Sequence, residues 1–363
     1  YNSTSVDGDA AIYILFIEEG QDGTWAAGSD YIKISTGYGK AESSDGTTPN
    51  GIGTVRGIDI DGNGTMDRLY AGDLQGNLYR IDVTSTTASD WSDSSNRSIL
   101  FRAKYGPAGS RTIPQPITTR PVVLRHPTEP GYIVIAATGS WIASDDSTSS
   151  DIQSIYGIWD NNTGYEVTMP GANNELVEQE FTNQVVVEHG FTVRSLSNNA
   201  VVWKDNGSAS NRVMGWYIDF DIPAAGSSTG VEFPGERAIR NLQLRGDFLF
   251  VNTVIPKSSN PCSTGAGGFE LALNPFTGGS GSKIIFDITA DGQYDLSDNI
   301  NDTDGDAYIV AGLRFDNTMP TDSAFIGNYR MTQQSDKSVR SVGTNTEVSN
   351  TSGRNSWREL IVH

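Results

Sequence analysis

The stretch "DIDGNGTMDRLYAGDLQGNLYRIDV" occupies residues 59–83 and sets the pattern for the rest of the chain. It begins with a loop rich in aspartate and glycine and continues into two short apolar runs, 68–73 and 77–83. Runs rich in Leu, Tyr and Ile that are bounded by Gly, Asp and Asn are typical of β-strands joined by turns. The stretch therefore predicts an acidic loop followed by two consecutive strands.

The second of these runs has counterparts along the chain. An apolar segment flanked by aromatic residues, often closed by Asp or Asn, recurs at 11–17, 77–83, 154–160, 215–221 and 268–274. Most copies follow another predicted strand, and the copies lie roughly 55 to 75 residues apart. A propeller blade needs about 40–50 residues, so these would be blades with inserted loops.

This repetition has a physical reason, because one blade cannot bury both of its faces whereas neighbouring blades packed around an axis can. We therefore predict an all-β fold, a modified β-propeller with inserted loops, and keep an irregular β-sandwich as the alternative. The polar stretch 333–353 predicts an exposed excursion before a last strand at 356–362.

Composition excludes several classes of protein. The 363 residues include 36% hydrophobic residues and 40 glycines, which indicates a globular chain with many turns. The net charge of −19 argues against nucleic acid or anionic lipid as the main partner, because phosphate neutralisation needs clustered Lys and Arg. No stretch approaches the roughly 20 apolar residues of a membrane helix.

The residue types that bind zinc or form disulfides are scarce. Cys262 is the one cysteine, which excludes an intrachain disulfide. We expect it to be a small buried or loop residue, with pairing to a cysteine outside these residues as the alternative. His126, His189 and His363 are too scattered to indicate a histidine metal site. The chain begins abruptly at Tyr1 without a signal peptide, so we expect a fragment of a longer protein.

The acidic loop follows the ligand spacing of an EF-hand. Asp59, Asp61, Asn63 and Asp67 stand at positions 1, 3, 5 and 9, and Thr65 at position 7 would offer its backbone carbonyl. A glycine at position 6 allows the sharp turn, and hard oxygen ligands on alternate residues suit calcium. Position 12 is a tyrosine, residue 70, so the bidentate carboxylate is missing. We predict a strand–loop–strand calcium site, with a solvated turn as the alternative.

A second, weaker candidate lies at 287–298. Its ligand positions 1, 3, 5, 7, 9 and 12 would be filled by Asp287, Thr289, Asp291, Gln293, Asp295 and Asp298. Threonine is a weaker ligand than aspartate, so we expect this loop to bind calcium less well than the loop at 59–67. Asp302, Asp304 and Asp306 follow closely and could add a ligand, although an exposed turn explains them better.

The ordered series of segments resembles the PilC/PilY family of type IV pilus-associated proteins. Residues 59–83 resemble the family's calcium loop and following blade. Further similar segments are "QPITTRPVV" (115–123), "QSIYGIWD" (153–160), "GERAIRNLQLRGDFLFVNT" (235–253), "PCSTGAGGFELALNPFTGG" (261–279) and "GRNSWRELI" (353–361). The resemblance covers roughly residues 10–363.

This resemblance implies a function as well as a fold. Residues 1–363 would form a single C-terminal β-propeller domain of a longer protein, either whole or lacking blades at its N-terminal end. Such a domain would lie at the bacterial surface on the pilus tip, after transit through the periplasm. The family is associated with pilus biogenesis, twitching motility, virulence and adhesion. The implied partners are minor pilins and a host-cell receptor, and the implied cofactor is Ca²⁺ on the loop at 59–67.

Two other classes of function compete with this non-enzymatic interpretation. A calcium-dependent propeller enzyme, a quinoprotein dehydrogenase or a glycosidase, would need a vicinal cysteine pair or an acid–base couple. The adjacent acids Glu18 and Glu19 are poor candidates, because neighbours on a strand point to opposite faces. A direct adhesin that binds glycan or protein is the third interpretation, and the RGD tripeptide at 245–247 is a candidate integrin motif. That tripeptide stands at a predicted strand start, which favours a structural role.

Overall fold

The computed structural model describes residues 6–43, 45–107, 110–168, 175–181, 186–205, 212–222, 231–256, 266–301 and 307–346. Within these ranges the chain is built from β-strands, and its helices are single 3-10 turns. These turns are η1 (Glu19–Asp22), η2 (Ala88–Ser92), η3 (Ser94–Asn96), η4 (Asp145–Ser147) and η6 (Leu296–Asp298). The prediction of an all-β fold is confirmed.

Four sheets and one hairpin form the body of the molecule. The hairpin pairs β1 (Ala11–Leu15) with β2 (Tyr31–Ser35). The first sheet has the order β3 (Arg56–Ile58), β4 (Arg68–Gly72), β5 (Asn77–Asp82), β6 (Arg97–Arg102). The second sheet has the order β12 (Leu176–Gln179), β15 (Gly215–Asp219), β11 (Ser154–Asp160), β10 (Tyr132–Ala137), β9 (Val122–Arg125).

The remaining two sheets exchange strands along the chain. The third sheet has the order β13 (Val186–Glu188), β14 (Phe191–Ser195), β22 (Val310–Phe315), β18 (Gly267–Leu273), β17 (Phe248–Ile255), β16 (Gln243–Arg245). The fourth has the order β19 (Phe286–Asp287), β25 (Val339–Thr344), β24 (Tyr329–Gln334), β23 (Pro320–Ile326). Two small pairs complete the set: β7 (Lys104–Tyr105) with β8 (Ile113–Pro114), and β20 (Ile300–Asn301) with β21 (Ala307–Tyr308).

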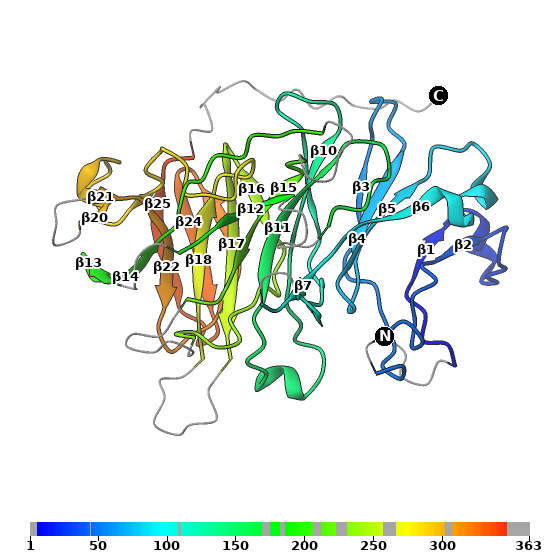
Figure 1. Ribbon diagram of the computed structural model, residues 1–363, viewed down its shortest axis with the longest axis horizontal. Coiled ribbons are helices and arrows are strands. Elements are labelled where there is room, and N and C mark those ends of the chain that lie inside the picture. Colours follow the sequence, from blue (N-terminus) through cyan, green and yellow to red (C-terminus); the bar gives the residue numbers. More distant parts are fainter. Residues whose placement is uncertain are drawn as a thin grey trace.

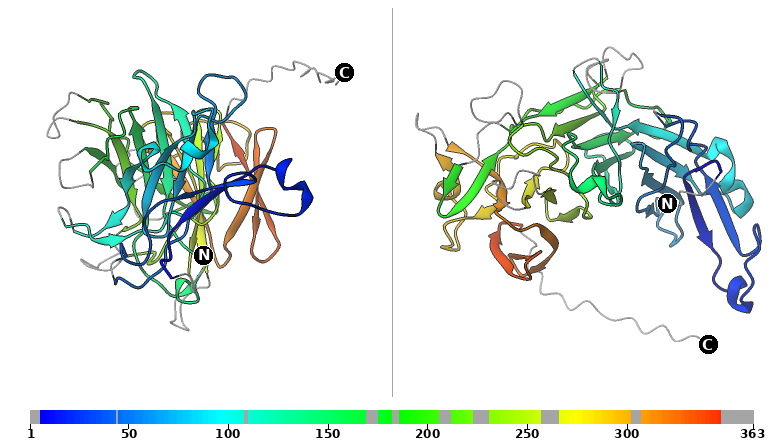
Figure 2. Two further views of the ribbon diagram at one scale, coloured as in Figure 1. Left: turned by 90° about the vertical axis from the view of Figure 1, so that its right-hand side faces the viewer. Right: turned by 90° about the horizontal axis from the view of Figure 1, so that it is seen from below.

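The sheets stand side by side in chain order (Figure 1). Seen from below, they follow a curved row from the β1–β2 hairpin to the β23–β25 strands (Figure 2). Each of the four sheets has one of its two edge strands on the same side of the molecule: β3, β9, β16 and β23. Residues of these four strands line one common cavity. Edge strands that converge on an axis are the arrangement of a β-propeller.

The recurring strand motif does not mark one blade per copy. The copies at 154–160 and 215–221 form β11 and β15, which are neighbours in the second sheet. Between them the chain adds β12 to this sheet and then leaves to form β13 and β14 of the third. The inserted residues therefore belong to another sheet, which spacing along the sequence could not show.

The polar stretch at 333–353 is also not an excursion throughout. Residues 339–344 form β25, which pairs with β19 and β24. Its arginine packs against the third sheet: Arg340 lies over the ring of Phe315 and 3.6 Å from the buried carboxylate of Glu270. The predicted last strand at 356–362 lies outside the described residues.

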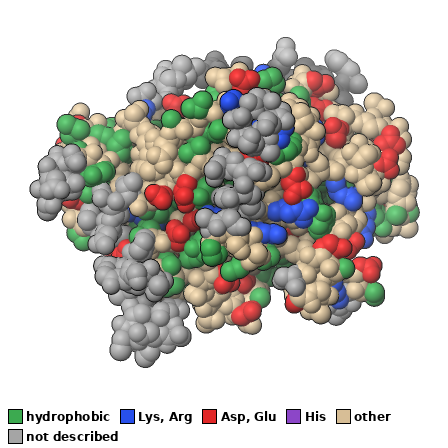
Figure 3. All heavy atoms as spheres, in the orientation of Figure 1, with side chains coloured by type: hydrophobic (Ala, Val, Ile, Leu, Met, Phe, Trp, Pro, Cys, Tyr) green, Lys and Arg blue, Asp and Glu red, His purple; other side chains and the backbone are tan. Residues whose placement is uncertain are grey.

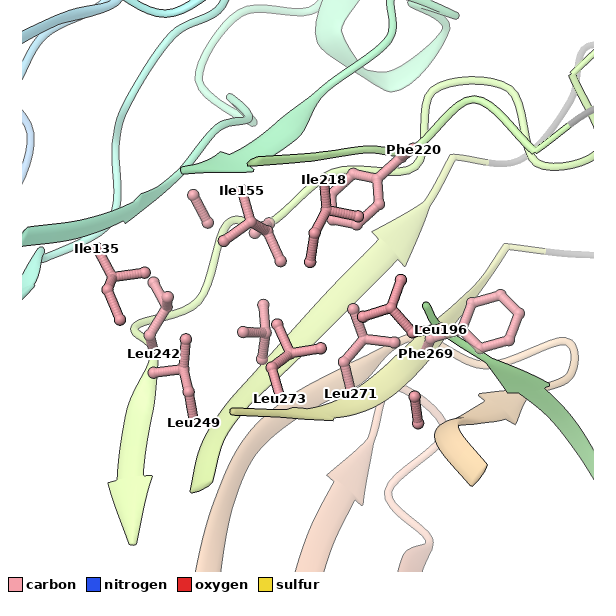
Figure 4. Close-up of a cluster of buried hydrophobic side chains, with 14 of the residues drawn as sticks. Ile135, Ile155, Leu196, Ile218, Phe220, Leu242, Leu249, Phe269, Leu271 and Leu273 are labelled. Atoms are coloured by element: carbon pink, nitrogen blue, oxygen red, sulfur yellow. The ribbon is translucent and has the colours of Figure 1, made fainter. Parts of the chain in front are cut away.

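Each junction between neighbouring sheets contains its own apolar cluster, because the central strands bury both faces. Along β10, Ile133 and Ile135 pack toward the third sheet, whereas Val134 and Ala136 pack toward the first. Side chains therefore alternate between two cores with the period of two that a strand imposes. Figure 4 shows the cluster between the second and third sheets.

Candidate metal centre

Residues 59–67 form the loop of the β3–β4 hairpin. Ile58 and Arg68 are the last paired residues of the two strands. The backbone N–H of Asp67 donates to the carbonyl of Ile58 at 2.9 Å, and the Asp67 carbonyl accepts from Val83 at 2.9 Å. The loop is thus joined directly to β3, β4 and the end of β5, in the predicted strand–loop–strand arrangement.

Glycine residues allow the loop to fold back on its first aspartate. The carboxylate of Asp59 accepts hydrogen bonds from the backbone N–H of Gly62 at 2.7 Å and of Gly64 at 2.8 Å. Both glycines have positive φ, 78° and 91°, in the left-handed region that side chains disfavour. The hydrogen bond from Gly64 is the main cause of a lowered pKa of Asp59, so this carboxylate is held in its charged form.

Three carboxylates converge in this loop. Oxygens of Asp59, Asp61 and Asp67 all lie within 4.8 Å of one another. It is the one such group of three acidic, His or Cys side chains in the part of the chain that the structure describes. Asp67 is buried and Asp61 exposed, so the group opens toward solvent on one side. Like charges at this separation repel each other, and a bound cation would remove that repulsion.

The two remaining predicted ligands complete the loop. The side-chain oxygen of Asn63 accepts from the backbone N–H of Thr65 at 2.7 Å. The amide of Asn63 also donates to Asp61 at 2.9 Å. The donor set is therefore oxygen throughout, with three carboxylates, one amide and one carbonyl, which is the chemistry that calcium prefers. These residues fit a calcium ion.

Tyr70, at the position where an EF-hand has its last glutamate, faces a different group. Its hydroxyl is buried and donates to the carboxylate of Asp160 in β11 at 2.6 Å. Burial raises the pKa of Tyr70, so the phenol stays neutral. The side chain at position 12 therefore contributes to the junction between the first and second sheets rather than to the acidic loop.

Asp160 is the centre of a buried polar network that the sequence analysis did not predict. Its carboxylate lies 3.1 Å from the guanidinium of Arg68 and 3.1 Å from that of Arg80. Arg68 also donates to Asn162 at 2.7 Å. The one available signal was the Asp that closes the strand motif at 154–160. Arg68 directly follows Asp67, so the network begins where the acidic loop ends.

The acidic loop at 59–67 lies between two cavities, one shared with the β1–β2 hairpin and one shared with the second sheet. One side lines a cavity of about 630 Å³ together with Ile14 of the hairpin and Trp91. The other side, through Ile60, lines a cavity of about 510 Å³ together with the β9–β10 turn at 126–131. The acidic loop therefore lies beside both the β1–β2 hairpin and the turn between β9 and β10.

The second candidate loop places its acids differently. The Thr289 hydroxyl lies within hydrogen-bond distance of both Asp287, at 3.3 Å, and Asp298, at 3.1 Å, so these two carboxylates are near each other. Asp295 instead caps η6 by accepting from the backbone N–H of Ser297 at 2.9 Å. Asp291 accepts from the backbone of Gln293 at 2.8 Å. The loop gathers two of its four acids, and its calcium binding stays a prediction. Asp302, Asp304 and Asp306 lie outside the described residues, as do Cys262 and His363.

The RGD tripeptide ends β16 with Arg245 and forms the turn to β17 with Gly246 and Asp247. The guanidinium of Arg245 donates to the carbonyl of Gly327 at 2.8 Å and lies 4.4 Å above the ring of Phe325. Gly246 has a φ of 56° and packs against the carbonyl of Thr346. Arg245 is therefore packed against the β23–β24 hairpin, whereas Gly246 and Asp247 are exposed in a tight turn.

The fold and the site define a class: a β-propeller protein with an acidic hairpin loop at one junction between sheets. Comparison with known proteins identifies the family. Residues 1–194 match the family described as the PilY1 beta-propeller domain. The chain belongs to this PilY1 β-propeller family.

Individual relatives agree with this assignment. The chain is 32% identical over 294 residues to the type IV pilus biogenesis factor PilY1 of Pseudomonas aeruginosa (strain UCBPP-PA14), covering 73% of the chain and 25% of that protein. It is 29% identical over 359 residues to a PilY1 homolog of Xylella fastidiosa (strain Temecula1), covering 95% and 26%. The chain thus spans about a quarter of the length of these relatives.

A solved structure supports the fold directly. The crystal structure of the Pseudomonas aeruginosa PilY1 C-terminal domain superposes with a TM-score of 0.69 at 26% identity. The match covers 94% of this chain and 67% of that one. Among the described residues, no helix has the length and apolar character needed to cross a membrane.

Proposed function

We propose that this chain is a calcium-binding, non-enzymatic β-propeller module of a type IV pilus tip protein. In this role it would regulate pilus extension and retraction and support adhesion to surfaces or host cells. The observation that carries the proposal is the convergence of Asp59, Asp61 and Asp67 in one hairpin loop. Membership of the PilY1 family supplies the pilus context.

The acidic loop would hold the cation through the three carboxylates, the side-chain oxygen of Asn63 and the carbonyl of Thr65. The bound ion supplies positive charge that offsets the repulsion among the carboxylates. Asp67 would couple calcium binding to the order of the first sheet. Its backbone is hydrogen-bonded to the ends of β3 and β5, and its side chain accepts from the N–H of Ile60 at 2.6 Å. Fixing Asp67 orders the ends of three strands of the first sheet.

Arg68, the residue that follows the acidic loop, would couple the order of the loop to the second sheet. Arg68 pairs with Asp160, and Asp160 is the last residue of β11. A calcium-bound state in which both sheets are held together would favour pilus engagement, and loss of the ion would favour retraction. The shift is limited by the difference in calcium affinity between the two states.

Partners and location follow from the same context. Minor pilins at the pilus tip are the proposed partners, and a host-cell receptor is a second one. Acidic side chains are scattered over the face shown in Figure 3, which disfavours nucleic acid as a partner. The proposed location is the bacterial surface, reached through the periplasm.

Calorimetry on purified protein tests the metal site. We expect Asp67→Ala and Asp61→Asn each to weaken calcium binding at least roughly tenfold, because each removes one charged ligand. Asp61 is exposed, so its variant controls for misfolding of the other. Asp336→Asn removes an acid from an exposed turn far from the loop and should bind as the wild type does. Unchanged calcium binding in both loop variants would refute the assignment.

Binding to purified minor pilins tests the pilus role. Surface plasmon resonance should show tighter binding in calcium than in chelator. Asp61→Asn should lose this difference, whereas Asp336→Asn should keep it. Pilin binding that is equal with and without calcium would refute regulation by the ion, even if the metal site itself is confirmed.

A further inference from the structure

The cavity on which the four sheet edges converge has a charge opposite to that of the protein. It has a volume of about 410 Å³ and is lined by residues of β3, β16 and β23 and by the strand entry at β9. Three of its lining residues are the arginines Arg56, Arg120 and Arg245, and none is acidic. The chain as a whole carries 44 acidic and 25 basic residues, so a cluster of one sign here is a local reversal.

The three arginines come from three different sheets. Arg56 begins β3, Arg120 precedes β9, and Arg245 ends β16. The side chains of Arg56 and Arg120 are exposed and have no acidic partner within the described part of the chain. Guanidinium groups are planar donors that bind carboxylates through paired hydrogen bonds. Residues far apart in the sequence thus offer several such donors to one space.

One of these arginines is already held in place. Arg245 donates to the carbonyl of Gly327 and stacks on Phe325, and the ring of Phe325 packs at 5.1 Å against that of Phe250. A guanidinium fixed in this way loses less rotational freedom on binding a ligand. The arginine of the RGD tripeptide therefore lines the inner cavity, where its side chain is held by Gly327 and Phe325.

The rest of the lining selects the kind of ligand. Val122, Val123 and Leu242 give the cavity an apolar wall beside its cations. Its volume is in the range of sites for small organic ligands. Edge strands such as β3 and β16 can pair with an extended peptide. A long polyanion that entered the cavity would also be repelled by the acidic outer surface. The ligand that fits best is therefore a short segment with a single negative charge.

We infer that this inner cavity binds a carboxylate of a partner peptide, either an acidic side chain or a free C-terminus, next to an apolar residue. The arginines bind the carboxylate and the apolar wall binds the neighbouring side chain. None of the residues that line this cavity belongs to the acidic loop at 59–67.

Fluorescence anisotropy with short labelled peptides tests the inference. The probes are Gly-Leu-Glu-Leu-Gly amide, its Gln counterpart, and Gly-Leu-Gln-Leu-Gly with a free C-terminus. We expect the wild-type chain to bind the Glu peptide or the free-terminus peptide at least roughly fivefold more tightly than the neutral Gln amide. The preferred probe then identifies the source of the carboxylate. Equal binding of all three peptides would overturn the inference.

Variants locate the binding in the cavity. Arg56→Gln and Arg120→Gln should each weaken binding of the preferred peptide roughly threefold to fivefold, the effect of one partly exposed ion pair. Both residues are exposed, so the fold should persist. Lys337→Gln removes one positive charge from the exposed turn between β24 and β25 and should change binding less than twofold. An equal loss in the Lys337 variant, or tighter binding of tripolyphosphate or oligodeoxythymidylate than of the peptide, would contradict the proposal.

Discussion

The guanidinium of Arg68 lies 3.1 Å from the carboxylate of Asp160, and this contact joins the first sheet to the second. Asp160 has no exposed side-chain surface, and Arg68 has 8%. Arg80 and the Tyr70 hydroxyl bind the same carboxylate oxygen. Three side chains from two strands therefore converge on this acid, and the first of them, Arg68, directly follows the last residue of the acidic loop.

Replacement of Asp160 by Asn should strongly destabilise the fold. The buried Arg68 and the partly buried Arg80 would lose their counter-charge, and breaking a buried pair in this way typically costs about 3–5 kcal/mol. Urea unfolding followed by tryptophan fluorescence would measure the loss. Asp205→Asn, which breaks the more exposed pair with Arg212, should cost less than about 1 kcal/mol. Similar losses for the two variants would show that Asp160 does not have this structural role.

Calcium bound to the acidic loop should stabilise the chain against unfolding. The transmission of this effect to the second sheet should depend on the Asp160 network. At a calcium concentration of 100 times the dissociation constant, the free energy of unfolding should rise by about 2.7 kcal/mol. Asp61→Asn should lose most of this gain. Arg68→Lys should bind calcium but transmit less order to the second sheet, because the lysine nitrogen ends one bond short of the guanidinium Nη1 that donates to both Asp160 and Asn162. Hydrogen exchange of β11 amides with and without calcium would measure this transmission, and equal calcium-dependent protection in wild type and Arg68→Lys would contradict it.

The strands and the acidic loop could be predicted from the sequence because their signals are local. Alternation of apolar residues, glycine turns and the spacing of Asp59, Asp61 and Asp67 are all visible within short windows. The Asp160 network could not be predicted, since Arg68 and Asp160 are 92 residues apart and their pairing depends on how two sheets pack. The same limit hid β25, whose burial depends on Arg340 contacting Phe315 and Glu270 rather than on an apolar pattern.

The loop at 287–298 should behave as a weaker calcium site than the first. Asp287 and Asp298 are together, but Asp295 is occupied as the cap of η6. In a chain that carries Asp61→Asn, calorimetry should show residual weak binding that Asp291→Asn reduces further. Asp291 is exposed and bonded only within the loop, so its loss should not disturb the fold. Residual binding that is indifferent to Asp291→Asn would remove the second loop as a site.

The RGD turn should not act as an integrin motif. Arg245 is engaged with Gly327 and Phe325, and Gly246 packs against Thr346, so the tripeptide cannot extend into a receptor cleft. In a solid-phase assay with an RGD-binding integrin, we expect the same signal from wild type and from Asp247→Glu. The longer side chain abolishes recognition wherever the motif is used, and Asp247 is exposed at the turn, so the fold should tolerate it. A loss of integrin binding in the variant would refute the structural role.

Stability should fall on acidification through His126. The ring is buried between Trp159 and Trp203, and its Nδ1 accepts the backbone N–H of Glu129 at 2.9 Å, which requires the neutral form. Burial lowers the pKa of His126 below 6.5, an effect that the Glu129 carboxylate partly opposes. The unfolded chain therefore takes up the proton first, and stability present above pH 6.5 is lost as the pH falls toward the folded pKa. Urea unfolding between pH 7.5 and 5 should show this slope in wild type and a shallower one in His126→Gln, whose side chain does not titrate. Equal slopes in the two proteins would assign the pH dependence to other groups.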